Sequence, residues 1–215
     1  MARARPRNPS WDDLFDRAAG QEGLFSTAQA AAAGYSPQLL QKHLRAGRAQ
    51  RVRRGVYRLV HFPPGEHEDL VAVWLWADRA GVFSHETALS LHGLSDVLPA
   101  RVHLSVPSAW SRRRLRVPQG VVLVYSDVPK EERTWVGPVP VTAVRRTLAD
   151  CIAAGVAPDL MEQAVKQAAA RGLVPRAELA RLTRPGRATE GKAARMNSFS
   201  SSGTGAGRPS LSMSA

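Results

Sequence analysis

Four polar side chains recur at helical spacing in the segment SPQLLQKHLRAG: Gln38, Gln41, Lys42 and Arg45. On a helix of 3.6 residues per turn they form one stripe, whereas leucines and His43 occupy the opposite side. Glutamine carboxamides can pair with adenine in the major groove of DNA, and lysine or arginine can pair with guanine. The spacing therefore predicts a helix that packs with one face and presents base-reading groups on the other.

The segment after this predicted helix is rich in arginine. From Leu24 to Gly65 the chain carries no Asp or Glu but seven Lys or Arg residues, more than half of its formal net charge of +12. Arginines along a β-hairpin can follow a phosphate backbone or enter a minor groove. RNA is the alternative partner, but the sequence has no RNP-like aromatic motif and no GXXG loop. The residues predicted to contact DNA are Ser36, Gln38, Gln41, Lys42, Arg45, Arg48, Arg51, Arg53, Arg54 and Arg58.

Capping signals delimit the helices that come before the polar stripe. Ser10 with Asp13 and Ser26 with Gln29 each match the capping box, in which the two side chains satisfy free N–H groups at a helix start. The residues predicted to end these helices in the left-handed conformation are Gly20 and Gly34.

The helix that carries the polar stripe is marked at both ends. Ser36 is a good N-cap, Pro37 suits the first helical position, and Gly47 follows the last turn. Downstream, AQRVRR and GVYRLV place β-branched and aromatic residues on either side of Gly55, which predicts a tight β-hairpin. Helix, glycine turn, helix and basic hairpin follow one another in the order of a winged helix-turn-helix.

The pattern changes at Pro63-Pro64-Gly65, where we place a domain boundary. Beyond it, EHEDLVAVWLWADRAG and HETALSLH predict helices, the second capped by Ser84, and RVHLSVP, GVVLVYS and the shorter VGPVPV predict strands. Thr142 is expected to cap a helix, and further helices fit 158–171 and 176–182. The side chains expected on the buried side of the helix after Thr142 are Val144, Leu148, Cys151 and Ile152.

These patterns predict the fold class α+β, with an N-terminal winged helix-turn-helix domain, a small mixed α/β domain and a disordered C-terminal tail. The tail prediction rests on its Gly, Ser and Ala content, which leaves little apolar surface to bury. The predicted boundaries are 1–9 for a disordered basic arm, 10–62 for the DNA-binding domain, 66–183 for the α+β domain and 184–215 for the tail.

A second basic cluster lies in the segment SRRRLRVP of the α+β domain. A solvated loop, extra phosphate contacts and a docking patch for an acidic protein surface all remain open for it. Its members are Arg112, Arg113, Arg114 and Arg116. Nearby, Trp110 and Trp135 stand beside Pro, Ser or Gly, so we expect one of them to be exposed at a protein interface.

Catalytic and metal-binding groupings are weak in this sequence. Acidic residues and a lysine meet only in YSDVPKEER, where Asp127, Lys130, Glu131 and Glu132 crowd one predicted loop rather than adjacent strands. His85 and His92 are too far apart on one helix to chelate an ion without a third element, and His103 lies on a strand. We therefore predict a protein that is not an enzyme and that needs no metal or other cofactor.

The sequence also bears on the cellular compartment. Cys151 is the single cysteine, so the chain cannot form an internal disulfide, and no run of about eighteen apolar residues predicts a membrane span. No apolar stretch follows the basic N-terminus as it would in a signal peptide. We expect a cytoplasmic protein with no membrane partner; the sequence does not determine its oligomeric state.

Several segments resemble the AbiEi family, the antitoxins of type IV toxin-antitoxin systems. LFSTAQAAAAGYSPQLLQKHLRAGRAQRVRRGVYRL is similar to the winged-helix domain of that family, including the turn Arg54-Gly55-Val56-Tyr57. FSHETALSLHGLSDVLPARVHLSVP and VPVTAVRRTLADCI are similar to its second domain. The resemblance covers about residues 10–182, and several motifs in the order of the family carry it rather than one diagnostic motif.

The resemblance implies a DNA-binding repressor of its own operon, which binds inverted repeats in its promoter. It also implies a partner toxin, a nucleotidyltransferase of the AbiEii type, which the second domain counters. The alternatives are a winged-helix transcription factor whose second domain senses a ligand or dimerises, and a degenerate nuclease. The residues that inherit the DNA-contact role from the resemblance are Gln38, Gln41, Lys42, Arg45, Arg51, Arg53 and Arg54.

Overall fold

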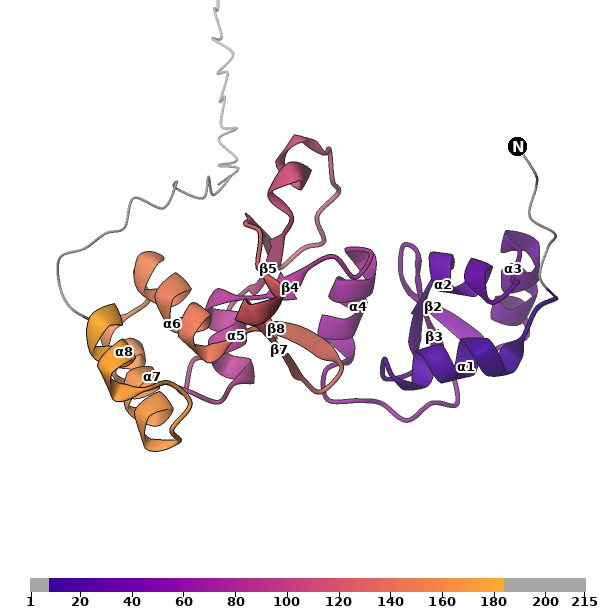
Figure 1. The fold of residues 1–215 in the computed structure, drawn as a ribbon. Coiled ribbons are helices and arrows are strands. Elements are labelled where there is room, and N and C mark those ends of the chain that lie inside the picture. The colour runs from indigo at the N-terminus through magenta and orange to yellow at the C-terminus, as the bar shows by residue number, and fades with distance from the viewer. Residues whose placement is uncertain (1–7, 184–215) are drawn as a thin grey trace, which may run out of the picture.

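The first part of the chain folds into three helices and a three-stranded antiparallel sheet (Figure 1). A computed structural model describes residues 8–183, so the predicted C-terminal tail and most of the predicted basic arm lie outside the described residues. The elements of the first part are α1 (Trp11–Ala19), β1 (Leu24–Ser26), α2 (Thr27–Ala32), α3 (Pro37–Arg45), β2 (Ala49–Arg53) and β3 (Val56–Leu59). Strand β3 lies between β1 and β2. We call this part the winged-helix unit, with β2 and β3 as its wing.

The helix starts of the winged-helix unit follow the predicted caps. The Ser26 hydroxyl accepts a hydrogen bond from the Gln29 backbone N–H at 3.2 Å, and the Gln29 carboxamide oxygen accepts one from the Ser26 N–H at 2.9 Å. Ser10 caps α1 through the Asp13 N–H at 3.1 Å. At α3, the Ser36 hydroxyl accepts from the backbone of the third helical residue at 3.2 Å. These helix starts are therefore encoded locally.

One predicted glycine conformation is wrong. Gly34, Gly47 and Gly55 have the positive φ expected of them, but Gly20 has φ −70°. The left-handed turn after α1 comes later, at Gly23 with φ 80°. A Cβ at Gly23 would lie 2.6 Å from the side chain of Phe62, so the chain needs glycine there for space as well as for conformation.

The second part of the chain, the α/β unit, contains a five-stranded mixed sheet in the order β6-β5-β4-β8-β7. β4 pairs in parallel with β8, β5 pairs in parallel with β6, and the other two pairs are antiparallel. Its helices are α4 (Glu68–Trp76), α5 (His85–Leu91), α6 (Val144–Ala153), α7 (Pro158–Ala170) and α8 (Arg176–Leu182). Its strands are β4 (Val82–Phe83), β5 (Val102–Val106), β6 (Val121–Tyr125), β7 (Arg133–Val136) and β8 (Val139–Thr142), with 3₁₀ turns η1 (Ser108–Arg112) and η2 (Lys130–Glu132).

Helices cover the sheet of the α/β unit from two sides. Figure 1 shows α4 between the sheet and the winged-helix unit, and α5 to α8 on the far side. Helix α4 is buried from Val71 to Leu75, as its nearly continuous apolar sequence requires. Leu148 and Cys151 of α6 are fully buried in the cluster formed with α5, α7 and α8. The α+β fold class predicted from the sequence is confirmed.

Several details of the α/β unit differ from the sequence predictions. VGPVPV is not one strand but the turn and second strand of the β7–β8 hairpin. The Ser84 and Thr142 hydroxyls do not cap helices: Ser84 accepts from the Ser105 hydroxyl at 2.8 Å, and the Thr142 hydroxyl pairs with that of Thr147 at 2.7 Å. Ile152, predicted to be buried, is 38% exposed because it lies on the outer side of α6.

The two units pack against each other through α4. Leu24 of β1 and Val56 of β3 are fully buried and belong to the same apolar cluster as Val71. Two polar contacts reinforce this packing: the Arg58 guanidinium lies 3.0 Å from the Glu68 carboxylate, and the backbone N–H of His67 donates to the carboxylate of Glu22. The domain boundary at residues 63–65 stays a prediction, since Leu24 and Val56 of the first unit are buried in the apolar cluster of the second.

Candidate nucleic-acid interface

Helix α3 presents the polar stripe to solvent. The side chains of Gln38, Gln41, Lys42 and Arg45 are all exposed, whereas Leu40 on the other face is 4% exposed and fills the core of the winged-helix unit. Ser36 is exposed at the start of the helix, where its hydroxyl oxygen is the N-cap acceptor. The division of α3 into a packing face and an outward polar face is therefore present in the fold.

An aromatic cluster holds α3 against the rest of the unit. The His43 ring stacks on Trp11 with a centroid separation of 5.2 Å and meets the edge of Tyr35 at 5.3 Å. Burial lowers the pKa of His43, and the charges of Arg48 and Lys42 lower it further. A neutral His43 thus joins the recognition helix to α1, which positions the outward stripe.

The wing places most of its predicted contact residues at the surface. Arg48, Arg51 and Arg54 are exposed and Arg53 is half-buried. The turn of the wing is held by the start of α2, because the Thr27 backbone N–H donates to the Gly55 carbonyl at 2.9 Å. The wing arginines consequently project from a turn that is fixed to the helix-turn-helix.

Arg58 departs from the other predicted contact residues. Its guanidinium donates to the Phe62 carbonyl at 2.9 Å and forms an ion pair with Glu68, and its side chain is 12% exposed. The Nε–H is close to the carboxylate without being aligned for a hydrogen bond. Arg58 joins the two units, so we exclude it from the candidate interface.

The second basic cluster lies beside the wing rather than apart from it. A cleft of about 730 Å³ is lined by Arg53 and Arg54 of the wing and by Arg113, Arg114 and Arg116 of the η1–β6 loop. Arg113 lies over the ring of Trp110 at 4.5 Å, and this contact holds the base of the loop. Arg112 is exposed just before it. The sequence could not show this proximity, because it depends on how the two units pack.

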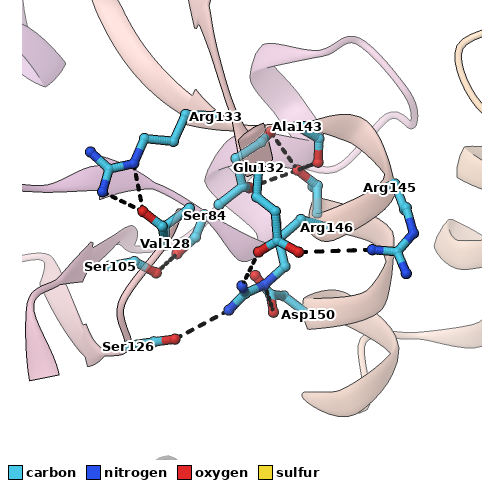
Figure 2. A network of polar contacts seen from close by, with 12 residues as sticks. Ser84, Ser105, Ser126, Val128, Glu132, Arg133, Ala143, Arg145, Arg146 and Asp150 are labelled. Carbon is cyan, nitrogen blue, oxygen red and sulfur yellow. Dashed lines mark hydrogen bonds and ion pairs between the residues drawn. The ribbon is translucent and has the colours of Figure 1, made fainter. Parts of the chain in front are cut away.

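The acidic residues considered for catalysis are engaged in separate contacts. Asp127 accepts hydrogen bonds from the hydroxyl and backbone N–H of Ser108, which lower its pKa. Glu132 instead faces Arg146 (Figure 2). Lys130 and Glu131 are exposed in η2. The grouping that is compact in the sequence is therefore divided between two contacts in space.

Arg146 is the centre of a polar network that joins α6 to the sheet (Figure 2). It binds Glu132, the Asp150 carboxylate at 2.8 Å and the Ser126 hydroxyl at 3.1 Å. Burial opposes its charge, yet the hydrogen bonds to Asp150 and Glu132 raise the pKa of Arg146. The adjacent Arg145 is more exposed and pairs with Glu178 of α8. These contacts join α6 to Ser126 after β6, to Glu132 of η2 and to Glu178 of α8. The network therefore holds these elements together.

The histidines of the α/β unit have packing contacts. His92 hydrogen-bonds to the Thr142 carbonyl at 2.8 Å, and His85 and His103 stack with ring centroids 5.6 Å apart. Burial lowers the pKa of all three rings. Within residues 8–183, no group of three or more His, Cys, Asp or Glu is arranged to hold a metal ion. Burial also raises the pKa of Cys151 to about 12, with Asp150 and Glu86 adding to the effect.

One of the two tryptophans considered for a protein interface is exposed, as expected: Trp110 is 8% exposed and Trp135 is 60% exposed. Sequence reasoning missed the proximity of Trp135 to Trp74, whose rings meet edge to face at 5.6 Å. None of the described helices is both long and apolar enough to cross a membrane.

Among known proteins, one family matches the first unit of the chain. A search of curated proteins finds none that matches the chain. Among solved structures, the chain is similar to the crystal structure of the RV2827C protein from Mycobacterium tuberculosis, with 19% identity over 85% of this chain and 74% of that one and a TM-score of 0.44. A family model described as "Transcriptional regulator, AbiEi antitoxin" matches residues 12–60, which span nearly the whole winged-helix unit. Residues 12–60 of this chain are therefore similar to the AbiEi antitoxin family of transcriptional regulators.

Proposed function

We propose that the protein is a DNA-binding autorepressor and the antitoxin of a type IV toxin-antitoxin pair. The observation that carries the DNA-binding part is the exposed stripe of α3 from Gln38 to Arg45, which adjoins the exposed arginines of the wing. A recognition helix needs such a stripe to reach base edges, and a wing needs cationic side chains to reach phosphates. The family match supports a regulatory and antitoxin role.

In the proposed complex, α3 enters the major groove of an inverted repeat in the protein's own promoter. Gln41 and Arg45 read bases, and Arg51 and Arg54 contact the phosphate backbone beside the groove. The cleft that Arg53 and Arg54 share with Arg113 and Arg114 supports a further role for the η1–β6 loop. We assign this loop to phosphate contact, which extends the electrostatic footprint from one unit to the other.

Binding of the full chain to a duplex of its own promoter, measured at several salt concentrations, tests this assignment. Arg45→Ala or Gln41→Ala should relax the preference at one base position by about 1 to 3 kcal/mol. Arg54→Ala should weaken binding to all sequences and reduce the salt slope by about 0.9. Arg181→Ala, an exposed arginine on α8, is the matched control and should change neither quantity. If the α3 and wing variants behaved alike, the division between reading and clamping would be wrong.

The same DNA assay decides the role of the η1–β6 loop. Arg113→Ala with Arg114→Ala should flatten the salt slope further if the loop contacts phosphates. A loop that docks an acidic protein would leave DNA binding unchanged and weaken binding of the toxin instead. The toxin is the nucleotidyltransferase of the AbiEii type that an adjacent gene would encode under this proposal; without such a gene, a regulator with no toxin partner is the better account.

We propose no catalytic step for this protein. Asp127 is engaged with Ser108 and Glu132 with Arg146, so neither carboxylate is presented with a lysine in the geometry of a nuclease site. A DNA-nicking assay with purified protein and added Mg²⁺ or Mn²⁺ should show no cleavage. Cleavage that an Asp127→Asn substitution abolished would overturn this part of the proposal.

A further inference from the structure

A pocket of about 340 Å³ lies between the two units, away from the residues assigned to DNA contact. Figure 1 shows the turn of the β7–β8 hairpin reaching toward the end of α1, and this is the region where the pocket lies. The winged-helix unit and the α/β unit each contribute part of its wall. Its lining residues that carry functional groups are Arg17, Gln21, Gln29, Trp74, Arg79 and Trp135.

Trp74 forms part of the pocket wall, and its indole N–H lies beneath that wall with almost no accessible surface. Trp74 is 8% exposed, and within the part of the chain that the structure describes its indole Nε1–H makes no hydrogen bond. An indole N–H that is buried usually finds an acceptor, because an unpaired buried donor destabilises the fold. The carboxamide oxygens of the neighbouring glutamines accept other hydrogen bonds: that of Gln21 accepts from the Gln29 amide at 2.8 Å, and that of Gln29 accepts from the Ser26 N–H at 2.9 Å.

The charge of the pocket is positive. Arg17 and Arg79 line it, both are exposed, and among residues 8–183 neither forms a salt bridge. No acidic residue contributes to the lining. Two guanidinium groups without a carboxylate between them favour an anion, and a guanidinium binds carboxylates and phosphates through paired N–H groups.

An aromatic surface completes the pocket. Trp135 is 60% exposed on the edge strand β7, and its ring meets that of Trp74 edge to face. An indole that is mostly open to solvent contributes little to the core, but its face can stack on a planar ring. The pocket thus brings together an open aromatic face and two arginines that form no salt bridge within residues 8–183.

We propose that this pocket binds a small anion that carries a planar aromatic group. Arg17 and Arg79 bind the anionic group, and the planar ring stacks on Trp135. Both a 5′-mononucleotide and an aromatic carboxylate have this chemistry. A ligand seated there contacts both units, which suits a regulator that responds to a metabolite.

Titration of the full chain with two probe classes tests the proposal. Adenosine and guanosine 5′-monophosphate represent the mononucleotides, and salicylate and indole-3-acetate represent the aromatic carboxylates. We expect saturable binding of one class, seen by calorimetry and by quenching of tryptophan fluorescence. Adenosine and benzyl alcohol lack the anionic group and should bind at least about tenfold more weakly, as expected when a charged hydrogen bond is lost.

Variants locate the binding within the pocket. Arg17→Ala with Arg79→Ala, and separately Trp135→Ala, should each weaken the probe by about tenfold or more. The control pair Arg176→Ala with Arg181→Ala lies on α8, and circular dichroism verifies that every variant is folded.

Two outcomes would overturn the proposal: no saturable binding of either probe class at millimolar concentration, or binding that the Arg17, Arg79 and Trp135 variants leave unchanged. These titrations use the protein without DNA. Their failure is therefore distinct from a failure of the promoter-binding experiment, which needs no ligand.

Discussion

Arg58 has the residue type and the position of a DNA contact, yet the fold uses it to join two units. It shares the strand pattern of the other wing arginines, but its side chain turns toward Glu68 and the Phe62 carbonyl. The spacing of residues along a strand predicts which face of the sheet a side chain occupies. It does not predict what covers that face. The neighbouring unit covers it here.

This difference predicts opposite effects for two wing arginines. Arg54→Ala should reduce the salt slope of DNA binding with little effect on stability, because Arg54 is exposed. Arg58→Ala should leave the slope unchanged but lower the free energy of unfolding by about 1 to 3 kcal/mol, since it leaves Glu68 and a carbonyl without their partner. Salt-dependent binding and urea unfolding of both variants check this. A reduced salt slope of DNA binding for Arg58→Ala would show that Arg58 contacts DNA after all.

Arg145 and Arg146 form a second matched pair of adjacent arginines. The Arg146 side chain is 21% exposed and holds Glu132, Asp150 and Ser126, whereas that of Arg145 is 52% exposed. Arg146→Leu should therefore lower the free energy of unfolding by about 2 to 4 kcal/mol, because the Asp150 carboxylate loses its cation and Glu132 keeps only the longer contact with Arg145. Arg145→Leu should cost less than about 1 kcal/mol, as exposed ion pairs do. Equal losses in urea unfolding would show that burial does not decide the outcome.

Helix α3 depends on a neutral His43 for its attachment. Since the pKa of His43 is lowered in the folded protein, the unfolded chain binds a proton more readily. Stability is thus complete above the ordinary histidine pKa of about 6.5 and declines as the pH falls through the lower folded-state pKa. The buried rings of His85, His92 and His103 act in the same direction, because their pKa values are also lowered.

A substitution isolates the contribution of His43. His43→Phe retains an aromatic ring between Trp11 and Tyr35 but cannot be protonated, so the melting temperature should fall less steeply between pH 7 and pH 5 than in the parent. His61→Gln, which removes an exposed histidine, should keep the parental slope. Differential scanning fluorimetry across this pH range makes the comparison, and an unchanged slope in His43→Phe would contradict the role given to the ring.

The elements of this protein were predictable where their signals were local. The caps at Ser10, Ser26 and Ser36 and the wing turn at Gly55 each depend on residues a few positions apart, and all four are present. The caps predicted at Ser84 and Thr142 failed for a different reason. Their hydroxyls are buried and bind a hydroxyl from another element, Ser105 or Thr147, which competes with capping. The three residues of β1 were too few to show alternation in the sequence.

The two units should behave as one cooperative structure. Leu24 and Val56 are fully buried in a cluster that extends into α4, so separating the units would expose both. At about 1.5 to 3 kcal/mol for each side chain, this exposure is a large fraction of the stability of a small domain. We therefore expect a single calorimetric unfolding transition for the full chain.

A fragment that ends at residue 62 gives the complementary measurement. It should melt well below the full chain, because it lacks α4, which covers β1 and β3. Leu24 and Val56 would be exposed in the fragment, because α4 no longer covers them. Substituting Leu24→Ser and Val56→Thr should therefore make the fragment more soluble without restoring the higher melting temperature. Two separate transitions in the full chain, one of them at the melting temperature of the fragment, would show that the shared cluster does not couple the units.

The sequence by itself determined the local features: the helix starts, the packing and polar faces of α3, the basic hairpin and the α+β class. These follow from hydrogen bonds and side-chain periodicity within a few residues, and such interactions are present in any stretch with that order of residues. They were sufficient to indicate a winged helix and to predict that Gln38, Gln41, Lys42 and Arg45 form one exposed stripe on α3.

Tertiary structure decided everything that depends on residues far apart in the chain. Arg58 pairs with Glu68 and is not on the wing surface. Arg113 and Arg114 line the same cleft as Arg53 and Arg54. Trp135 and Trp74 line a pocket together with Arg17 and Arg79. The outcomes that involve both units depend on the burial of Leu24 and Val56 against α4, which sets how the two units meet. Apolar burial is not directional, so a sequence reports that a face must be covered but not which partner covers it.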